Sequence, residues 1–265
     1  MSSIENYLRL ATHVRNWWEY FKRKERKKQT AKYVTRGIPL WFEVPFDFYY
    51  VFKEIFLEDF YHLGTWLPQV PENAIIIDIG ANVGYFSFLM ASKKSQSTVY
   101  AFEPMKKNST VFQKNISINP NLQKRIILTE EAVTGTQTGL VTMFFDSVND
   151  NSVISSVYDD FSASNNQSLQ VKSIRLSDVI EQYDLKRIDI LKMDCEGSEY
   201  PILYDSPEAI WPLINCIVIE VHDMDIEKRN AAYLFKFLSN KGFAISSKTE
   251  STGCYSAVAI KKRNA

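Results

Sequence analysis

The chain has 265 residues, 45% of them hydrophobic, which suits one large domain with an additional segment. Its 31 basic and 31 acidic residues balance, so we expect no nucleic-acid partner and no electrostatic pull toward an acidic membrane. The sequence shows neither a transmembrane-length apolar run nor an apolar signal segment. Cys195, Cys216 and Cys254 lack metal-ligand spacing, which indicates reduced thiols and predicts a cytoplasmic location.

Residues 4–30 carry apolar and aromatic side chains at helical spacing and predict a helix. A basic run, Lys22 to Lys28, follows on the same segment. We favour a helix packed on the domain or on a second subunit. The alternative is a peripheral membrane or partner contact, because aromatic and basic residues together suit a membrane surface.

Residues 38–67 are rich in aromatics, and we expect most of these side chains to form core between the N-terminal segment and a sheet. Glu54, His62 or an aromatic here could close over a ligand. Residues 1–70 are therefore predicted to be a helical and aromatic appendage, and residues 71–265 the main domain.

The main domain opens with the consecutive β-branched run Ile75–Ile77, typical of a strand buried on both faces of a parallel sheet. Gly80, Asn82 and Gly84 follow, and an apolar stretch from Tyr85 predicts a helix. Strand, glycine turn and helix form the nucleotide-binding opening of a doubly wound fold.

A second strand, Thr98–Phe102, ends at Glu103, which follows Gly84 by 103 − 84 = 19 residues. An acid at this spacing is placed to accept hydrogen bonds from ribose hydroxyls. The loop has Asn82 where a dinucleotide fingerprint needs its second glycine, and we expect Asp78 to put a negative charge at the mouth of the site. This pattern favours a ligand with an adenosine and a cationic end, such as S-adenosylmethionine, over NAD.

Further strands and helices alternate along the chain, which predicts a mostly parallel sheet with helices on both faces. We expect strands at 125–129, 188–193, 215–221, 243–247 and 255–261, helices at 104–118 and 225–240, an added antiparallel pair at 140–146 and 170–174, and a long irregular loop at 149–168.

Four motifs resemble those of FkbM-family methyltransferases. They are Asp-Ile-Gly-Ala-Asn-Val-Gly-Tyr-Phe-Ser (78–87), Ala-Phe-Glu-Pro (101–104), Leu-Lys-Met-Asp-Cys-Glu-Gly-Ser-Glu (191–199) and Ile-Glu-Val-His (219–222). The resemblance covers about residues 50 to 262. It implies a class I, Rossmann-like, seven-stranded sheet whose final strand is antiparallel, and S-adenosylmethionine-dependent O-methylation of a glycan or secondary-metabolite hydroxyl.

Two sets of site residues follow from the residues and the resemblance together. The cofactor set comprises Asp78, Gly80, Asn82, Gly84, Tyr85, Glu103, Pro104, Glu131, Ala132 and Asp194. The catalytic set lies at the ends of two strands and comprises Asp194, Glu196, Glu220 and His222. His222 suits general-base catalysis near neutral pH, with Asp194 orienting it or acting as the base itself.

Alternatives to this interpretation stay open. The catalytic set also offers ligands for Mg²⁺ or Mn²⁺, although the sequence does not fix a metal site. The chain could instead be a non-catalytic nucleotide-binding or interaction module of the same fold. It could also be an N-methyltransferase, although the Asn/Asp-Pro-Pro-Tyr type motif of amino-group methylation is replaced here by Met193-Asp194-Cys195-Glu196.

Overall fold

The computed structural model describes residues 3–26, 29–136, 138–146, 151–156 and 166–262. The helices are α1 (Ser3–His13), α2 (Glu19–Arg26), α3 (Tyr49–Lys53), α4 (Leu63–Trp66), α5 (Tyr85–Lys93), α6 (Lys106–Ser117), α7 (Leu176–Gln182), α8 (Glu199–Tyr204) and α9 (Ala231–Asn240). The strands are β1 (Thr30–Val34), β2 (Trp41–Pro45), β3 (Ile75–Ile79), β4 (Thr98–Phe102), β5 (Ile126–Thr129), β6 (Ala132–Thr134), β7 (Gly139–Asp146), β8 (Asn151–Ser156), β9 (Gln167–Arg175), β10 (Ile190–Met193), β11 (Cys216–His222), β12 (Phe243–Ser251) and β13 (Cys254–Lys261).

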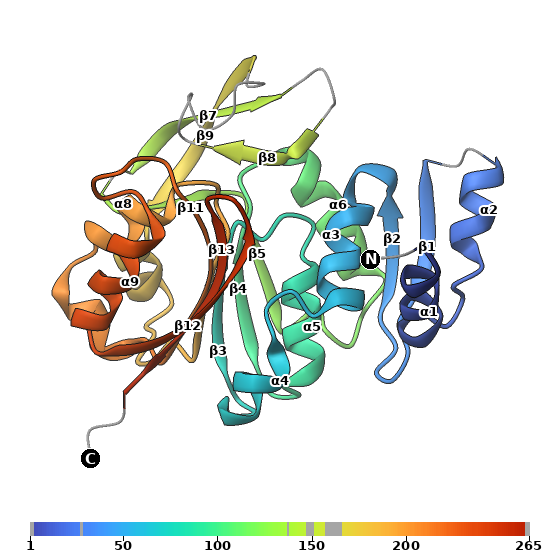
Figure 1. Ribbon diagram of the computed structural model, residues 1–265, viewed down its shortest axis with the longest axis horizontal. Coiled ribbons are helices and arrows are strands. Elements are labelled where there is room, and N and C mark those ends of the chain that lie inside the picture. The colour runs from blue at the N-terminus through green and yellow to red at the C-terminus, as the bar shows by residue number, and fades with distance from the viewer. Residues whose placement is uncertain (1–2, 27–28, 137, 147–150, 157–165, 263–265) are drawn as a thin grey trace.

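A seven-stranded sheet forms the centre of the molecule, in the order β12-β13-β11-β10-β3-β4-β5 (Figure 1). The strands from β11 to β5 pair in parallel. β13 lies between β11 and β12 and runs antiparallel to both. The predicted doubly wound, mostly parallel sheet with an antiparallel last strand is therefore confirmed.

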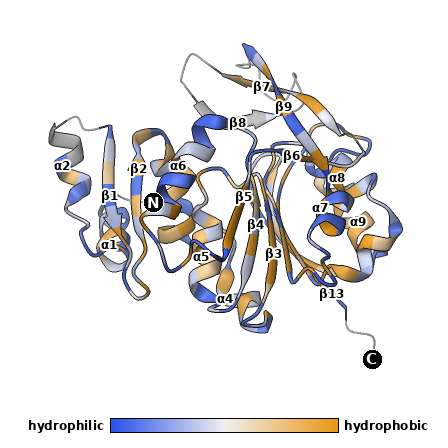
Figure 2. Ribbon diagram, turned by 180° about the vertical axis from the view of Figure 1, so that it is seen from behind, coloured by the Kyte–Doolittle hydropathy of each residue, from blue (hydrophilic) through white to orange (hydrophobic). Residues whose placement is uncertain are grey.

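Both faces of this sheet are covered, as the consecutive apolar run in β3 requires. Ile76 packs with α5 and α6, whereas Ile77 packs with α7, α8 and α9, because successive side chains of a strand point to opposite faces. Figure 2 shows β3, β4 and β5 as hydrophobic strands in the interior. Around β3, the strand ends are thus the part left accessible to a ligand.

The N-terminal segment differs from the single helix predicted over residues 4–30. α1 ends at His13, Val14 forms a β-bridge with Thr35, and α2 follows as a separate helix. Asn16 explains the break, because its side chain accepts from the backbone N–H of Val34 at 2.9 Å and donates to the carbonyl of Lys32 at 2.8 Å. The antiparallel hairpin β1–β2 was not predicted. Lys27 and Lys28, the last two residues of the basic run, lie outside the described part of the chain.

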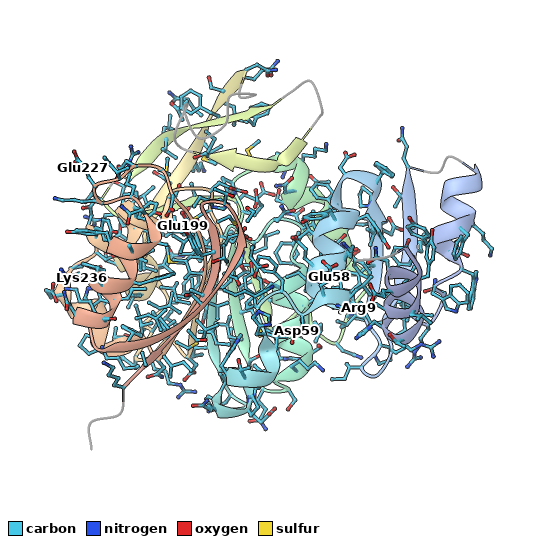
Figure 3. The ribbon with its side chains drawn as sticks, viewed as in Figure 1. Arg9, Glu58, Asp59, Glu199, Glu227 and Lys236 are labelled. Atoms are coloured by element: carbon cyan, nitrogen blue, oxygen red, sulfur yellow. The ribbon has the colours of Figure 1, made fainter. Side chains whose placement is uncertain are left out.

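The first 70 residues share a hydrophobic core with the sheet, as the aromatic content of residues 38–67 predicted. Phe42 of β2 packs edge-on against Tyr85 and Phe88 of α5, with ring centroids 5.3 and 5.2 Å apart. Phe52 of α3 joins the same cluster. On the outer side, α1 is tied to this segment by Arg9, which donates to the carbonyl of Leu57; Figure 3 labels Arg9 beside Glu58 and Asp59.

A four-stranded sheet, β6-β9-β7-β8, stands above the central sheet in the view of Figure 1. β7 and β9 are antiparallel, which confirms the predicted pair. The expected irregular loop at 149–168 is wrong over 151–156 and 167–168, where β8 and the start of β9 form. Residues 149–150 and 157–165 of that prediction lie outside the described part of the chain.

The helix expected from Asp225 begins six positions later. Oδ1 of Asp225 accepts from the backbone N–H groups of Glu227, Lys228 and Arg229 and closes a turn instead. Asn230 then caps α9 by accepting from the N–H of Tyr233. The side chain of Asp225 thus stabilises a turn over residues 225–229, and the helix begins only after this turn.

Candidate active site

A cavity of about 1040 Å³ opens at the carboxyl ends of β3, β4, β10 and β11. The segment from Tyr50 to Tyr61 lines one side of it, and the turn between β12 and β13 lines another. An open parallel sheet binds its ligands at this edge. The cavity is therefore the candidate active site.

The glycine loop after β3 touches the turn after β10. Gly80 has φ +69°, and a Cβ on it would lie 1.9 Å from the carbonyl oxygen of Asp194. Only glycine permits both this backbone conformation and this approach. Asn82 follows with φ +52° and lines the cavity. Gly80, Ala81 and Asn82 of this loop thus line the cavity.

Glu103 lies at the carboxyl end of β4, 4% exposed, with its carboxylate at the cavity. Oε2 accepts from the N–H of Asn82 at 2.8 Å, and Oε1 accepts from the N–H of Met105 at 2.8 Å and from Asn108. Burial raises the pKa of Glu103 to about 7 despite these bonds. Oε2 keeps a second acceptor position, which a ribose hydroxyl could use.

Asp78 does not put its charge at the mouth of the site. Its side chain is fully buried, accepts from Oγ of Ser87 at 2.6 Å and lies 3.4 Å from Nζ of Lys192. Burial raises the pKa of Asp78, opposed by Lys192. Burial would lower the pKa of Lys192, but Asp78 and Asp194 together raise it. Lys192 also donates to the carbonyl of Gly80 at 2.8 Å, so the ion pair of Asp78 and Lys192 anchors the glycine loop.

Two more residues of the predicted cofactor set lie outside the cavity lining. Gly84 has φ +84° at the start of α5, where a Cβ would lie 2.1 Å from the ring of Phe112. Glu131 is half-buried in the β5–β6 connection and does not line the cavity. Tyr85, Pro104 and Ala132 do line it, together with Gly80, Asn82, Glu103 and Asp194.

Asp194 occupies the end of β10. Its Oδ2 accepts from the hydroxyl of Tyr61 at 3.1 Å and lies 3.7 Å from Nζ of Lys192. The turn after it is held by Glu199, whose carboxylate accepts from the N–H groups of Cys195 and Gly197, each at 2.8 Å. Figure 3 shows Glu199 beside the upper ends of the central strands. The buried Glu199 thus fixes the backbone of the turn that directly follows Asp194.

The end of β11 and the turn after β10 bring the other predicted catalytic residues together. Nε2 of His222 lies 3.8 Å from Oε2 of Glu196 and 3.6 Å from Oε1 of Glu220. Burial, then the charge of Asp194, raises the pKa of Glu220 to about 8 and that of Glu196 well above its usual range. Cys254 of β13 donates from Sγ to Oε1 of Glu220 at 3.1 Å.

Most of the charged side chains around the cavity are acidic. Within the described part of the chain, Lys192 is the one lysine or arginine that lines it, and it is already paired with Asp78 and Asp194. The acidic lining residues are Asp47, Glu54, Glu58, Glu103, Asp194, Glu196, Glu220, Asp223 and Glu250. This set disfavours a pyrophosphate and suits a sulfonium ligand with a ribose, so the residues fit S-adenosylmethionine.

Sequence reasoning missed two of the residues that meet here. Tyr61 comes from the aromatic segment, and Cys254 comes from the last strand, where it pairs in register with His222. Neither carries a local motif, since strand register and long-range packing place them. Glu54 lines the cavity, and burial, then Asp194, raises its pKa to about 7. His62, the other residue considered, precedes α4 and lies outside the lining.

The strand order, the glycine loop and the acid at the end of β4 define a class I methyltransferase. The family model described as Methyltransferase FkbM domain matches residues 78–245, and the chain belongs to this family of S-adenosylmethionine-dependent methyltransferases. The resemblance of its four motifs is thereby confirmed.

The chain is similar to known proteins that are named methyltransferases. It is 29% identical over 217 residues to Methyltransferase 1 of Beauveria bassiana, covering 74% of this chain and 81% of the relative. It is 25% identical over 203 residues to 31-O-demethyl-FK506 methyltransferase FkbM of Streptomyces tacrolimicus, covering 66% and 75%. A solved structure of methyltransferase FkbM from Methylobacillus flagellatus superposes with a TM-score of 0.46 at 16% identity, covering 71% of this chain and 44% of that one.

Proposed function

We propose that this protein transfers a methyl group from S-adenosylmethionine to a hydroxyl of a glycan or secondary metabolite. The observation that carries the proposal is the convergence of Asp194, Glu196, Glu220 and His222 at one cavity with the glycine loop and Glu103. Names of two relatives support the acceptor class: one is a 31-O-demethyl-FK506 methyltransferase, and one, from Haloferax volcanii, is a hexuronic acid methyltransferase.

On the donor side, Glu103 would accept from the ribose hydroxyls while Asn82 and Met105 hold its carboxylate in place. The backbone of the glycine loop, Pro104 and Ala132 would contact the rest of the nucleoside, and Asp194 would border the methyl. Bound there, the donor supplies an electrophilic methyl on a sulfonium. The sheet ends and the aromatic segment would exclude water from it.

On the acceptor side, Asp194 would take the proton of the attacking hydroxyl. The hydroxyl oxygen bonds to the methyl carbon, the C–S bond breaks with its electron pair left on sulfur, and the proton passes to the carboxylate. Support comes from the position of Asp194 at the strand end next to the glycine loop and from Lys192, whose Nζ lies 3.7 Å from Oδ2 of Asp194. His222, Glu196 and Glu220 would bind and orient the hydroxyl.

The test is a methyl-transfer assay with isotopically labelled donor against a panel of sugars, uronic acids, polyketides and amines. We expect labelled ether products. Labelled amines alone would favour the N-methyltransferase alternative. Donor binding without transfer to any extract of the producing cells would favour the non-catalytic module.

Two proposals concern the N-terminal segment. We propose that residues 1–70 act as an appendage to the domain at 71–265, and that residues 4–30 make a self-association or peripheral membrane contact. Leu8 and Trp18 are exposed by 61% and 47%, which supports such a contact. No helix in the described ranges is long and apolar enough to cross a bilayer. Sedimentation with and without anionic vesicles tests the contact, and fractionation of cells tests the proposed cytoplasmic location.

A further inference from the structure

Three side chains on the acceptor side of the cavity have the chemistry of metal ligands. Glu220 and His222 are two residues apart on β11 and therefore share one face of the strand. Cys254 lies directly opposite His222 in the antiparallel register of β11 and β13. One oxygen, one nitrogen and one sulfur from these residues all lie within 4.8 Å of one another. Two hydrogen-bonded strands thus fix the positions of all three side chains.

The separations of these atoms fit a shared ion. Sγ of Cys254 lies 3.1 Å from Oε1 of Glu220, and Nε2 of His222 lies 3.6 Å from the same oxygen. Metal bonds of about 2.0–2.3 Å in a tetrahedron place the ligand atoms roughly 3.3–3.6 Å apart. Small rotations of the side chains would therefore bring the three atoms around one ion.

We propose that Glu220, His222 and Cys254 form a binding site for a divalent metal ion of the zinc class. A thiolate, an imidazole and a carboxylate together select zinc over magnesium or manganese, which prefer oxygen ligands. Cys254 is what distinguishes this site from the Mg²⁺ or Mn²⁺ ligand set considered from the sequence. In the metal-free protein its thiol donates to Glu220, and on binding it would lose that proton and turn its sulfur to the ion.

The fourth position of the ion would face the cavity. All three residues line the cavity, and Oε2 of Glu196 lies 3.8 Å from Nε2 of His222 on the same side. Three protein ligands with one open position are typical of catalytic rather than structural zinc sites. A hydroxyl bound there would lose its proton more readily, and Asp194, at the end of the neighbouring strand β10, would accept it.

Cobalt substitution tests the site without donor or acceptor, so its result is independent of the proposed methyl transfer. Metal-free protein should bind one Co²⁺ per chain and develop a thiolate-to-cobalt charge-transfer band in the near ultraviolet. Cys254→Ser should lose the band. Cys216→Ala is the matched control, because Cys216 is buried at the other end of β11 in the core and should leave the band unchanged.

A second variant keeps the test decisive if Cys254→Ser folds poorly. His222→Gln should weaken cobalt binding by more than about 100-fold, since even outer-sphere changes cost 10–100-fold. Calorimetry with the donor product on each variant reports whether the fold is intact. A wild-type protein without the band, a band that persists in Cys254→Ser, or unchanged cobalt affinity in His222→Gln would overturn the site. If the wild-type protein shows the cobalt band but transfers no methyl group, that result would count against the proposed function and not against the metal site.

Discussion

The hydroxyl of Tyr61 donates to Oδ2 of Asp194 at 3.1 Å, joining residues 133 positions apart. Burial raises the pKa of Tyr61 well above its usual range, so the hydroxyl keeps its proton at neutral pH. A protonated donor on one oxygen fixes the orientation of the carboxylate and leaves its other oxygen available. The N-terminal segment therefore contributes a side chain to the candidate active site.

Replacing Asp194 by Asn should lower kcat by about 10²–10⁴, because the variant cannot take the hydroxyl proton. Donor affinity should change little, since the proposed ribose contacts are made by Glu103. Steady-state kinetics and calorimetry on one preparation separate the two effects. Full turnover by the variant would remove Asp194 as the base, and His222→Ala would then be the next variant to test.

Tyr61→Phe should reduce kcat by roughly 10–100-fold, as expected for one lost hydrogen bond to a charged group. The aromatic ring stays, so the stability of the fold should be nearly unchanged. Tyr204→Phe is the matched control, because its hydroxyl bonds the carbonyl of Lys228 away from the cavity. Equal rates for both variants would mean that Tyr61 only packs.

Glu103→Ala should weaken binding of S-adenosylmethionine and of its demethylated product by about 1.5–3 kcal/mol, if its bonds to the ribose are charge-assisted. Glu131→Ala should leave affinity unchanged, because Glu131 lies outside the cavity lining. Calorimetry measures both. NAD should give no heat; tight NAD binding with a silent methyl donor would contradict the cofactor assignment.

Donor affinity should rise with pH across the range in which Glu103 titrates. Its pKa is raised by burial to about 7, and ribose hydroxyls prefer the ionised form, so binding competes with the proton below that value. The dissociation constant should fall from about pH 6 to about pH 8. Glu54 and Glu220 titrate nearby, so Glu103→Gln is the control that should remove most of the slope.

The same group should make the ligand-free protein less stable as pH rises. The folded state keeps the proton of Glu103 above the pKa of the unfolded chain, so the folded state binds more protons than the unfolded state. The free energy of unfolding should therefore fall between about pH 4.5 and about pH 7. Urea titrations of wild type and Glu103→Gln should show a steeper fall for the wild type; parallel curves would contradict the raised pKa.

Gly80→Ala should destabilise the fold by more than the strain of a left-handed residue alone. Gly37→Ala supplies the comparison, since Gly37 has φ +71° with open space around it, whereas a Cβ on Gly80 meets the carbonyl of Asp194. The control should cost about 1–2 kcal/mol, and Gly80→Ala clearly more. Equal denaturation midpoints for the two variants would show that the loop around Gly80 rearranges without a further loss of stability.

Local patterns predicted the central sheet well. The consecutive apolar run of β3, the glycine loop and Glu103 are patterns of residues close together in sequence, and the structure places Gly80, Asn82 and Glu103 at the cavity. Asp78 is the exception. The sequence analysis expected its charge at the mouth of the site, but Asp78 is buried and paired with Lys192 on the neighbouring strand. A contact between strands 114 residues apart has no signature in the loop itself (192 − 78 = 114).

The N-terminal segment and the last strand show why the rest could not be predicted. Helical spacing over residues 4–30 was correct for α1 and α2, but the interruption depends on Asn16 bonding to β1, a strand that itself had no clear pattern. Cys254 reaches His222 only through the register of β13 on β11. Such pairings arise from packing of the whole chain rather than from local preference.

The strand order of the central sheet also affects how the chain is made. β3 pairs with β4 soon after both are synthesised, but its other neighbour, β10, follows by 190 − 76 = 114 positions. Throughout that interval one edge of Ile75–Ile79 is open, and the strand is apolar on both faces. An open apolar edge invites pairing with other chains. We therefore expect nascent chains stalled between β4 and β10 to aggregate, or to be captured by chaperones that bind short apolar strands.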